Sequence, residues 1–162
     1  MLRGSAVLVG MCCVAFSGFA LLHAQNSPQN PAQNPPQHAA ALSRVPPYHS
    51  EPPKGPLPAT LDPKLFPDRL NQKVYAIAGK EKKILYQQPC YCGCDREVGH
   101  KSLLDCFCDR HASICAACKM EAVFAYQQYR KGKSAAQIRA EIIAGKWRSV
   151  DLSPYGDSAK AK

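Results

Sequence analysis

The sequence lacks the residue arrangements that mark the common enzyme classes. It has no recognisable Ser/His/Asp constellation, glycine-rich phosphate loop or paired-carboxylate motif, so the chain is not expected to be an enzyme. Acidic residues are also scarce, 12 against 21 lysines and arginines, which leaves a formal net charge of +9. Because few aromatics interleave with these basic residues, no nucleic-acid partner is expected. Contact with anionic membrane surfaces or cell-wall polymers is the expected use of the charge.

Residues 25–62 have almost no large apolar side chains and are dominated by Pro, Gln, Asn and Ala. Such a segment buries too little apolar surface to offset the entropy of ordering, and its prolines favour extended conformers. We therefore predict a disordered linker, with His38 and His49 in solvent. One domain is left, at about residues 63–152, followed by a flexible tail at 153–162. Domains of this size often depend on metals or crosslinks.

Residues 1–24 have the pattern of a secretory signal peptide. A short basic start containing Arg3 precedes an uncharged, largely apolar run over residues 5–22, and Ala24 offers a cleavage point. An uncleaved membrane anchor is the alternative. The protein is accordingly expected to be exported to the periplasm or outer cell envelope.

The pattern of apolar residues predicts a small, mainly α-helical domain. Pro63 and Pro67 mark a helix start, and apolar residues follow at helical spacing up to an expected interruption at Gly79. Residues 115–129 are rich in helix formers and end before Gly132. The residues Ser134-Ala-Ala-Gln fit a capping box that opens a last helix. We expect these two helices to form a hairpin on which a cysteine-rich loop packs.

Residues 89–118 place seven cysteines and two histidines within thirty positions. The spacings are C-x-C-x-C, then C-x-C, then H-x3-C-x2-C. Alternate side chains of an extended segment share a face, which would group the first three cysteines, and positions i, i+4 and i+7 of a helix share a stripe, which would group the last three ligands. The predicted metal ligands are Cys90, Cys92, Cys94, Cys106, Cys115 and Cys118, followed by His111, and then by His100 and Cys108. Asp105 is a candidate for orienting a histidine, whereas Asp95 and its charged neighbours are expected in a solvated turn.

Soft thiolates select Cu(I), Zn(II) or iron–sulfur centres. The spacings do not match ferredoxin runs, and seven cysteines exceed the four ligands of one structural zinc. Repeated C-x-C suits bridging thiolates in a small polynuclear site, so Cu(I) is the leading cofactor and Zn(II) the alternative. The predicted function is metal sequestration or delivery, with a metal-delivery or envelope protein as partner.

Two other interpretations of the cysteines remain open. An exported chain meets oxidising conditions, so the cluster can instead be a disulfide or zinc staple of a structural or interaction domain. A thiol oxidoreductase is the weaker alternative, because the C-A-A-C run at 115–118 lacks the preceding strand of a thioredoxin-like unit.

The hexapeptide Pro-Cys-Tyr-Cys-Gly-Cys at 89–94 carries a family resemblance, together with the Gly-His-Lys-Ser-Leu run at 99–103 and the cysteines and histidine that follow. Over roughly residues 66–145 the chain resembles the PCYCGC-motif family of bacterial exported proteins and lipoproteins. The family has no firmly assigned activity, and the resemblance implies a metal-related role for its cysteines. Cys108 is an addition to the family pattern, and we therefore place it last among the ligands.

Overall fold

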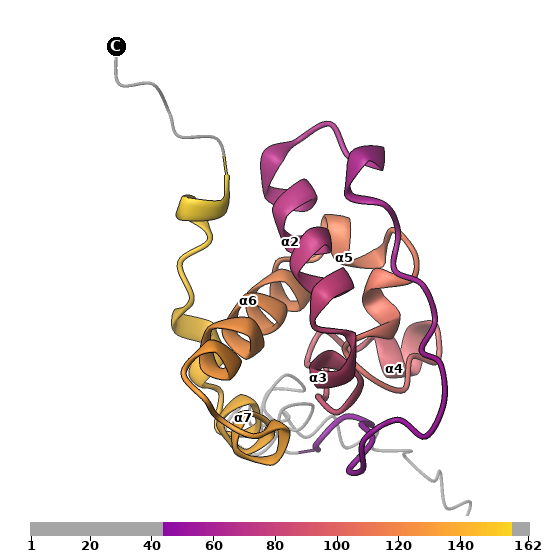
Figure 1. Ribbon diagram of the computed structural model, residues 1–162, viewed down its shortest axis with the longest axis vertical. Coiled ribbons are helices and arrows are strands. Elements are labelled where there is room, and N and C mark those ends of the chain that lie inside the picture. The colour runs from indigo at the N-terminus through magenta and orange to yellow at the C-terminus, as the bar shows by residue number, and fades with distance from the viewer. Residues whose placement is uncertain (1–43, 157–162) are drawn as a thin grey trace, which may run out of the picture. The chain divides into compact units, whose positions relative to one another are not determined.

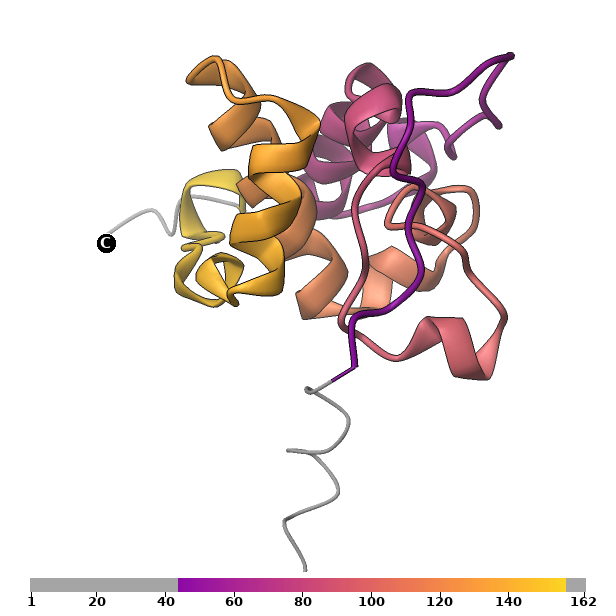
Figure 2. The same cartoon turned by 90° about the horizontal axis from the view of Figure 1, so that it is seen from below.

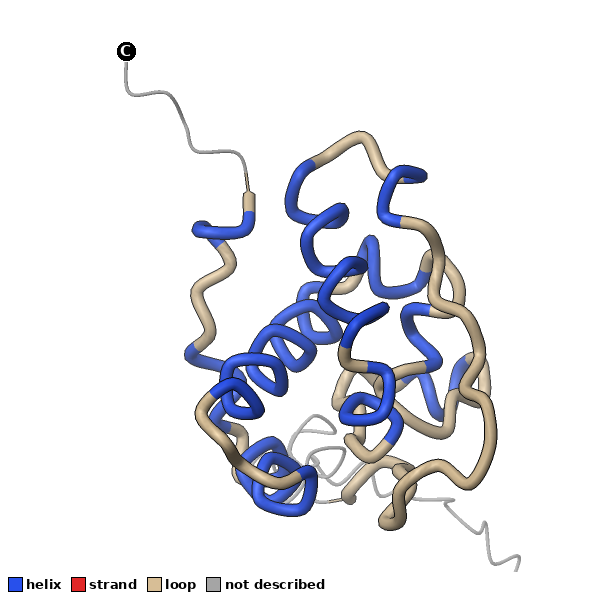
Figure 3. Tube along the Cα trace, viewed as in Figure 1, coloured by secondary structure: helices blue, strands red, loops and turns tan. Residues whose placement is uncertain are grey.

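The computed structural model describes residues 44–156, and between these residues every regular element is a helix and none is a strand (Figure 3). The α-helices are α2 (Arg69–Lys80), α3 (Lys82–Tyr86), α4 (Cys94–Glu97), α5 (His111–Ile114), α6 (Ala116–Arg130) and α7 (Ala135–Ile143). Single 3-10 turns are η1 (Pro63–Leu65), η2 (Asp105–Phe107), η3 (Lys146–Ser149) and η4 (Ser153–Tyr155). The predicted small helical fold class is therefore confirmed.

Helix α6 is the centre of the domain and is packed on by α2, α3, α5, α7 and η3 (Figure 1). Because neighbours cover several of its faces, it buries polar as well as apolar side chains. Its buried residues are Cys118, Lys119, Glu121, Ala122, Val123, Phe124, Ala125 and Gln128. Cys118, near the start of α6, is thus held on a largely buried helix.

The turn between α6 and α7 forms as its sequence predicts. Gly132 adopts a left-handed φ of 84°, a conformation that costs glycine little, and its N–H bonds to the Tyr129 carbonyl. Ser134 caps α7 in a reciprocal capping box with Gln137. Trp147, in η3 after α7, is buried against the same core.

Helix α2 differs from the prediction at both ends. The expected helix start is divided: Asp62 caps the separate turn η1, and Asp68 caps α2 itself. The expected interruption at Gly79 is wrong, because α2 continues through it to Lys80. A Cβ atom at this position would lie 3.3 Å from the Thr60 hydroxyl, so the glycine allows close approach of the preceding chain rather than a break in the helix.

Residues 44–62, which we call the N-terminal strap, run beside the segment that carries α4 (Figure 2). Arg44 pairs with Asp95 at 2.9 Å, and His49 stacks on Tyr86 with ring centroids 3.9 Å apart. The Leu61 N–H bonds to the Phe107 carbonyl at 2.9 Å. This part of the predicted linker therefore makes specific contacts with the domain.

The predicted signal segment, the rest of the linker with His38, and most of the predicted tail lie outside the described residues. Within residues 44–156, no helix combines the length and apolar character needed to cross a bilayer.

Candidate metal centre

The first three cysteines are brought together by a tight turn. Residues 91–93 form a turn, and Gly93 adopts a φ of 89° immediately before Cys94 begins α4. The expectation of an extended segment with alternating side chains is therefore wrong, although its consequence holds: the three sulfurs still face a common volume. A non-glycine residue would be strained at this φ, so Gly93 sets the direction of the Cys94 side chain.

Cys106, the first residue of the second C-x-C run, is held in place by buried apolar side chains around it. Leu103, Leu104 and Phe107 are fully buried, and the Leu103 N–H bonds to the Gln88 carbonyl at 2.9 Å. These contacts fix η2, from which the buried Cys106 points to the cluster. Asp105 does not contact a histidine as proposed from the sequence. Its carboxylate accepts the N–H groups of residues 101 and 102 and so closes the turn before η2.

The last three ligands do not lie on one helix. Cys115 has extended dihedrals (φ −107°, ψ 114°) and separates α5 from α6. The predicted stripe through His111, Cys115 and Cys118 is therefore interrupted. His111 begins α5 and Cys118 lies in the first turn of α6, yet both reach the same cluster. The packing of α5 on α6 brings His111 and Cys118 together, which had been expected from their spacing along one helix.

Six side chains converge in two overlapping groups, each with its ligand atoms within 4.8 Å of one another. The first group is Cys90, Cys92, Cys94 and Cys106. The second group is Cys92, Cys106, His111 and Cys118. Short sulfur contacts join Cys90 and Cys92 at 3.3 Å, Cys94 and Cys106 at 3.4 Å, and Cys90 and Cys118 at 3.5 Å. The His111 Nε2 atom lies 3.3 Å from the Cys92 sulfur.

These separations suit the coordination sphere of a soft metal ion. With Zn–S bonds of about 2.3 Å, two sulfurs on one ion lie at most about 4.6 Å apart, and about 3.8 Å apart at a tetrahedral ion. The sulfur contacts of 3.3–3.5 Å are slightly shorter than the tetrahedral value. A small outward movement of the side chains would therefore accommodate an ion, and the cluster is able to hold one.

His100 lies beside the cluster and is oriented by a carboxylate that sequence reasoning missed. Its Nδ1 atom is 3.4 Å from the Cys106 sulfur, and its Nε2 atom is 3.5 Å from the Asp109 carboxylate. Histidine ligands commonly have a carboxylate on the second nitrogen, which fixes ring orientation and raises ligand basicity. His100 is placed to support the cluster through Cys106, although it belongs to neither group.

Cys115 and Cys108 also lie outside both groups. Cys115 is partly buried at the edge of the cluster. A hydrogen bond with Cys118 lowers the pKa of its thiol, but a hydrogen bond with Cys92 and burial raise it overall. The Cys108 thiol points instead to the Leu104 carbonyl at 3.6 Å. Burial raises the pKa of Cys108 to about 11, which keeps it protonated. Its position agrees with its last place among the predicted ligands.

Hydrogen bonding within the cluster lowers the pKa values of the Cys92 and Cys106 thiols. Hydrogen bonds from Cys118 and Cys90 lower the pKa of Cys106 to about 4, and hydrogen bonding, first from Cys106, lowers that of Cys92. The pKa of the Cys94 thiol is raised, chiefly because it donates to Cys106. Burial opposes protonation of His111, but its hydrogen bond with Cys92 raises the imidazole pKa overall. Thiolate is the form of cysteine that binds metal, so the lowered pKa values of Cys92 and Cys106 favour the metal-binding form.

Glu121 is a second residue that the sequence analysis missed. Its side chain is fully buried beneath the cysteine turn, and Oε1 accepts the Tyr91 N–H at 2.9 Å, while Oε2 has no hydrogen-bond partner. Burial raises the pKa of this carboxyl to about 8. The available signal was its position three residues after Cys118 on a predicted helix, which places both side chains on one face.

The N-terminal strap covers one side of the first group. Pro46 is buried, and Pro46 and Pro47 line a small cavity together with Cys90, Cys94 and His100. The pair between Arg44 and the largely buried Asp95 closes this side. The prediction that Asp95 lies in a solvated turn is wrong, because the strap covers it.

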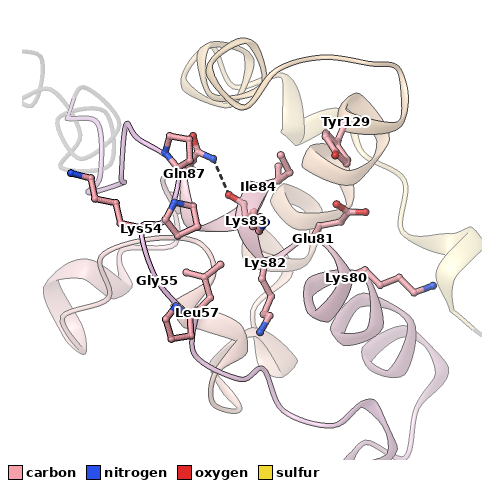
Figure 4. Close-up of a pocket in the computed structure, with 13 residues that line it drawn as sticks. Lys54, Gly55, Leu57, Lys80, Glu81, Lys82, Lys83, Ile84, Gln87 and Tyr129 are labelled. Atoms are coloured by element: carbon pink, nitrogen blue, oxygen red, sulfur yellow. Dashed lines mark hydrogen bonds between the residues drawn. The ribbon is translucent and has the colours of Figure 1, made fainter.

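A larger groove of about 680 Å³ lies between the strap and the α2–α3 junction (Figure 4). Lys54, Lys80, Lys82 and Lys83 line it, with Glu81 as the acidic member. The amino groups of Lys54, Lys80 and Lys82 point in different directions in Figure 4, so they do not converge on one small anion. No cysteine or histidine lines this groove, which leaves the cysteine cluster as the better candidate site among the described residues.

Over residues 44–156, the fold and site define a small all-helical domain with a largely buried Cys/His cluster able to hold a metal ion. A family model described as "Protein of unknown function with PCYCGC motif" matches residues 53–151. The chain therefore belongs to the PCYCGC-motif family, and the match extends beyond the resemblance at 66–145 on both sides. No curated protein and no solved structure matches the chain.

Proposed function

We propose that this protein binds soft metal ions outside the cytoplasm and that its cargo is Cu(I), which it sequesters or delivers. The observation that carries the proposal is the convergence of five cysteines and one histidine, from the cysteine turn, η2, α5 and α6, in overlapping groups whose atoms lie close enough to bind one ion. A donor set dominated by thiolate sulfur selects soft ions over Mg²⁺ or Ca²⁺.

The exposure of the cluster supports delivery as well as storage. Cys90, Cys94, Cys106 and Cys118 are buried, which protects the bound ion, whereas Cys92 and Cys115 are partly exposed at its edge. A receiving protein can exchange its own thiolates for exposed ligands one at a time, without the ion passing through water. We therefore infer a partner in the cell envelope that donates or accepts the ion.

Export of the chain is part of the same proposal and depends on the signal pattern at residues 1–24. The basic groove supports contact with anionic lipid headgroups or cell-wall polymers, because four of its lining residues are lysines. Such contact would hold the domain at the envelope, whether or not the N-terminal segment remains attached.

Zn(II) is the second candidate, because each group offers four ligands, the number that a structural zinc takes. Zn(II) also neutralises more of the buried thiolate charge than Cu(I) does. A zinc site of this kind would stabilise the fold directly. It would then be a structural centre rather than one that exchanges its ion with a partner.

Metal competition tests the proposal. The reduced full chain would be titrated with Cu(I) and with Zn(II), each buffered by a chromophoric chelator, and the bound metal quantified. Replacing Cys90, Cys92 and Cys94 together by Ser should abolish most uptake, whereas Cys108→Ser should retain it, because Cys108 faces the Leu104 carbonyl. Equal metal content in the two variants would contradict a metal function. Preference for Zn(II), with slow exchange and a large gain in thermal stability, would favour the structural role.

A further inference from the structure

The two ligand groups are not alternative descriptions of one site. Together they contain six ligands, whereas one thiolate-bound zinc ion takes four. Cys90 and Cys94 belong to the first group alone, and His111 and Cys118 to the second alone. A single ion in either position would leave two of these four ligands without metal.

The residues shared by the two groups are Cys92 and Cys106, and both are cysteines. This is the chemistry that sharing requires, because a thiolate sulfur has several lone pairs and can bridge two ions. An imidazole nitrogen has one lone pair, and the histidine belongs to only one group. The ligand type therefore agrees with the geometry at each position.

The two positions draw on different chain segments, although the sulfur of Cys90 in the first group lies 3.5 Å from that of Cys118 in the second. The first group is built from the cysteine turn at 90–94 and from η2, and its four ligands are all sulfurs. The second group adds α5 and α6, which supply one nitrogen and one sulfur to the shared pair. The two positions therefore share the cysteine turn and η2, but only the second uses α5 and α6, and they differ in ligand chemistry.

We propose that the cluster is a two-ion centre in which Cys92 and Cys106 bridge an all-sulfur position and a position with three sulfurs and one nitrogen. This inference rests on the proposed soft-metal function and specifies its stoichiometry and ligand assignment. The thiols that bind lose their protons to solvent, and no redox change is involved.

Cadmium is the probe for this centre, because ¹¹³Cd takes thiolate and imidazole ligands and reports them by NMR. The reduced full chain loaded with ¹¹³Cd(II) should give two resonances, one at the shift of four sulfurs and one at that of three sulfurs and one nitrogen. Scalar coupling between the two nuclei is expected through the shared sulfurs. Native mass should show two ions per chain. One ion, more than two ions, or two uncoupled ions would overturn the two-ion centre.

Single substitutions assign the positions. Cys94→Ser should remove the all-sulfur resonance and leave one ion, whereas His111→Asn should remove the other resonance. Cys92→Ser should disturb both, and Cys108→Ser is the matched control that should keep both ions. Loss of the same resonance in the Cys94 and His111 variants would refute the assignment.

Circular dichroism would show whether a variant fails to fold. Scalar coupling between the two cadmium nuclei of the wild-type protein tests the two-ion centre independently of any variant. The proposed function fails separately: a chain that retains neither Cu(I) nor Cd(II) against a chelator is not a metal protein, whereas one retained ion refutes only the two-ion centre.

Discussion

Replacing Glu121 by Gln should change how the stability of the metal-free domain depends on pH. The carboxyl is fully buried, accepts the Tyr91 N–H through Oε1 and has no partner at Oε2. Burial raises its pKa from 4.5 to about 8. Glutamine keeps a carbonyl for the Tyr91 N–H and carries no charge, so it mimics the protonated acid.

The sign follows from proton binding. Between pH 4.5 and about 8 the folded state holds a proton on Glu121 that the unfolded state has lost. The contribution of this carboxyl to stability is therefore fully present below pH 4.5 and is lost as the pH rises toward 8. One proton corresponds to a change of at most about tenfold per pH unit in the unfolding equilibrium. From pH 5 to pH 8, the unfolding constant of the wild type should rise relative to that of Glu121→Gln by roughly two to three powers of ten.

Urea unfolding of both reduced, metal-free chains, followed by far-ultraviolet circular dichroism between pH 5 and 8, measures this ratio. The thiol groups are present in both chains, so the ratio reports the Glu121 carboxyl together with its interactions with Cys90, Cys92 and Cys106. A ratio that stays constant with pH, or that moves in favour of the wild type at high pH, would refute the assignment of a buried, protonated Glu121.

Three further predictions concern the strap, the core and the cap of α7. Arg44→Ala removes the partner of Asp95. In stopped-flow measurements, this change should speed the transfer of a bound ion from the first group to a chelator, without changing metal stoichiometry. An unchanged transfer rate would show that the strap does not limit access to the cluster. Phe107→Ala should cost about 3–5 kcal/mol of unfolding free energy, because the ring is fully buried beside Cys106 and packs edge-on against Tyr75. Denaturant titration measures this loss, and a much smaller value would show that Phe107 does not anchor η2. Ser134→Ala should cost about 0.5–2 kcal/mol through loss of the α7 cap, whereas Ser149→Ala, at an exposed serine outside that cap, is the control that should change the melting temperature little.

The main features of the helical domain follow from local sequence patterns. Gly132 and Ser134 predict the end of α6 and the start of α7, because left-handed glycine and the capping box act within a few residues. The density of cysteines in residues 89–118 likewise predicts a soft-metal cluster. In each case the physical cause lies within a short stretch of chain.

The details of the cluster depend on tertiary contacts between different elements. The break at Cys115, the pairing of His100 with Asp109 rather than Asp105, and the cover provided by the strap could not be read from residue spacing. Each results from packing that aligns elements against the buried α6 and the anchors at 103–107.

Composition therefore determined that this chain carries a thiolate-rich cluster on a small helical domain. Only the tertiary structure decided which sulfurs face one another: Cys92 and Cys106 belong to both groups that could hold an ion, while Cys108, in the same run, turns away toward Leu104. The reason is physical. Ligand chemistry is a property of each residue type, but a distance of 3–5 Å between side chains from different segments is set by the packing of the whole domain.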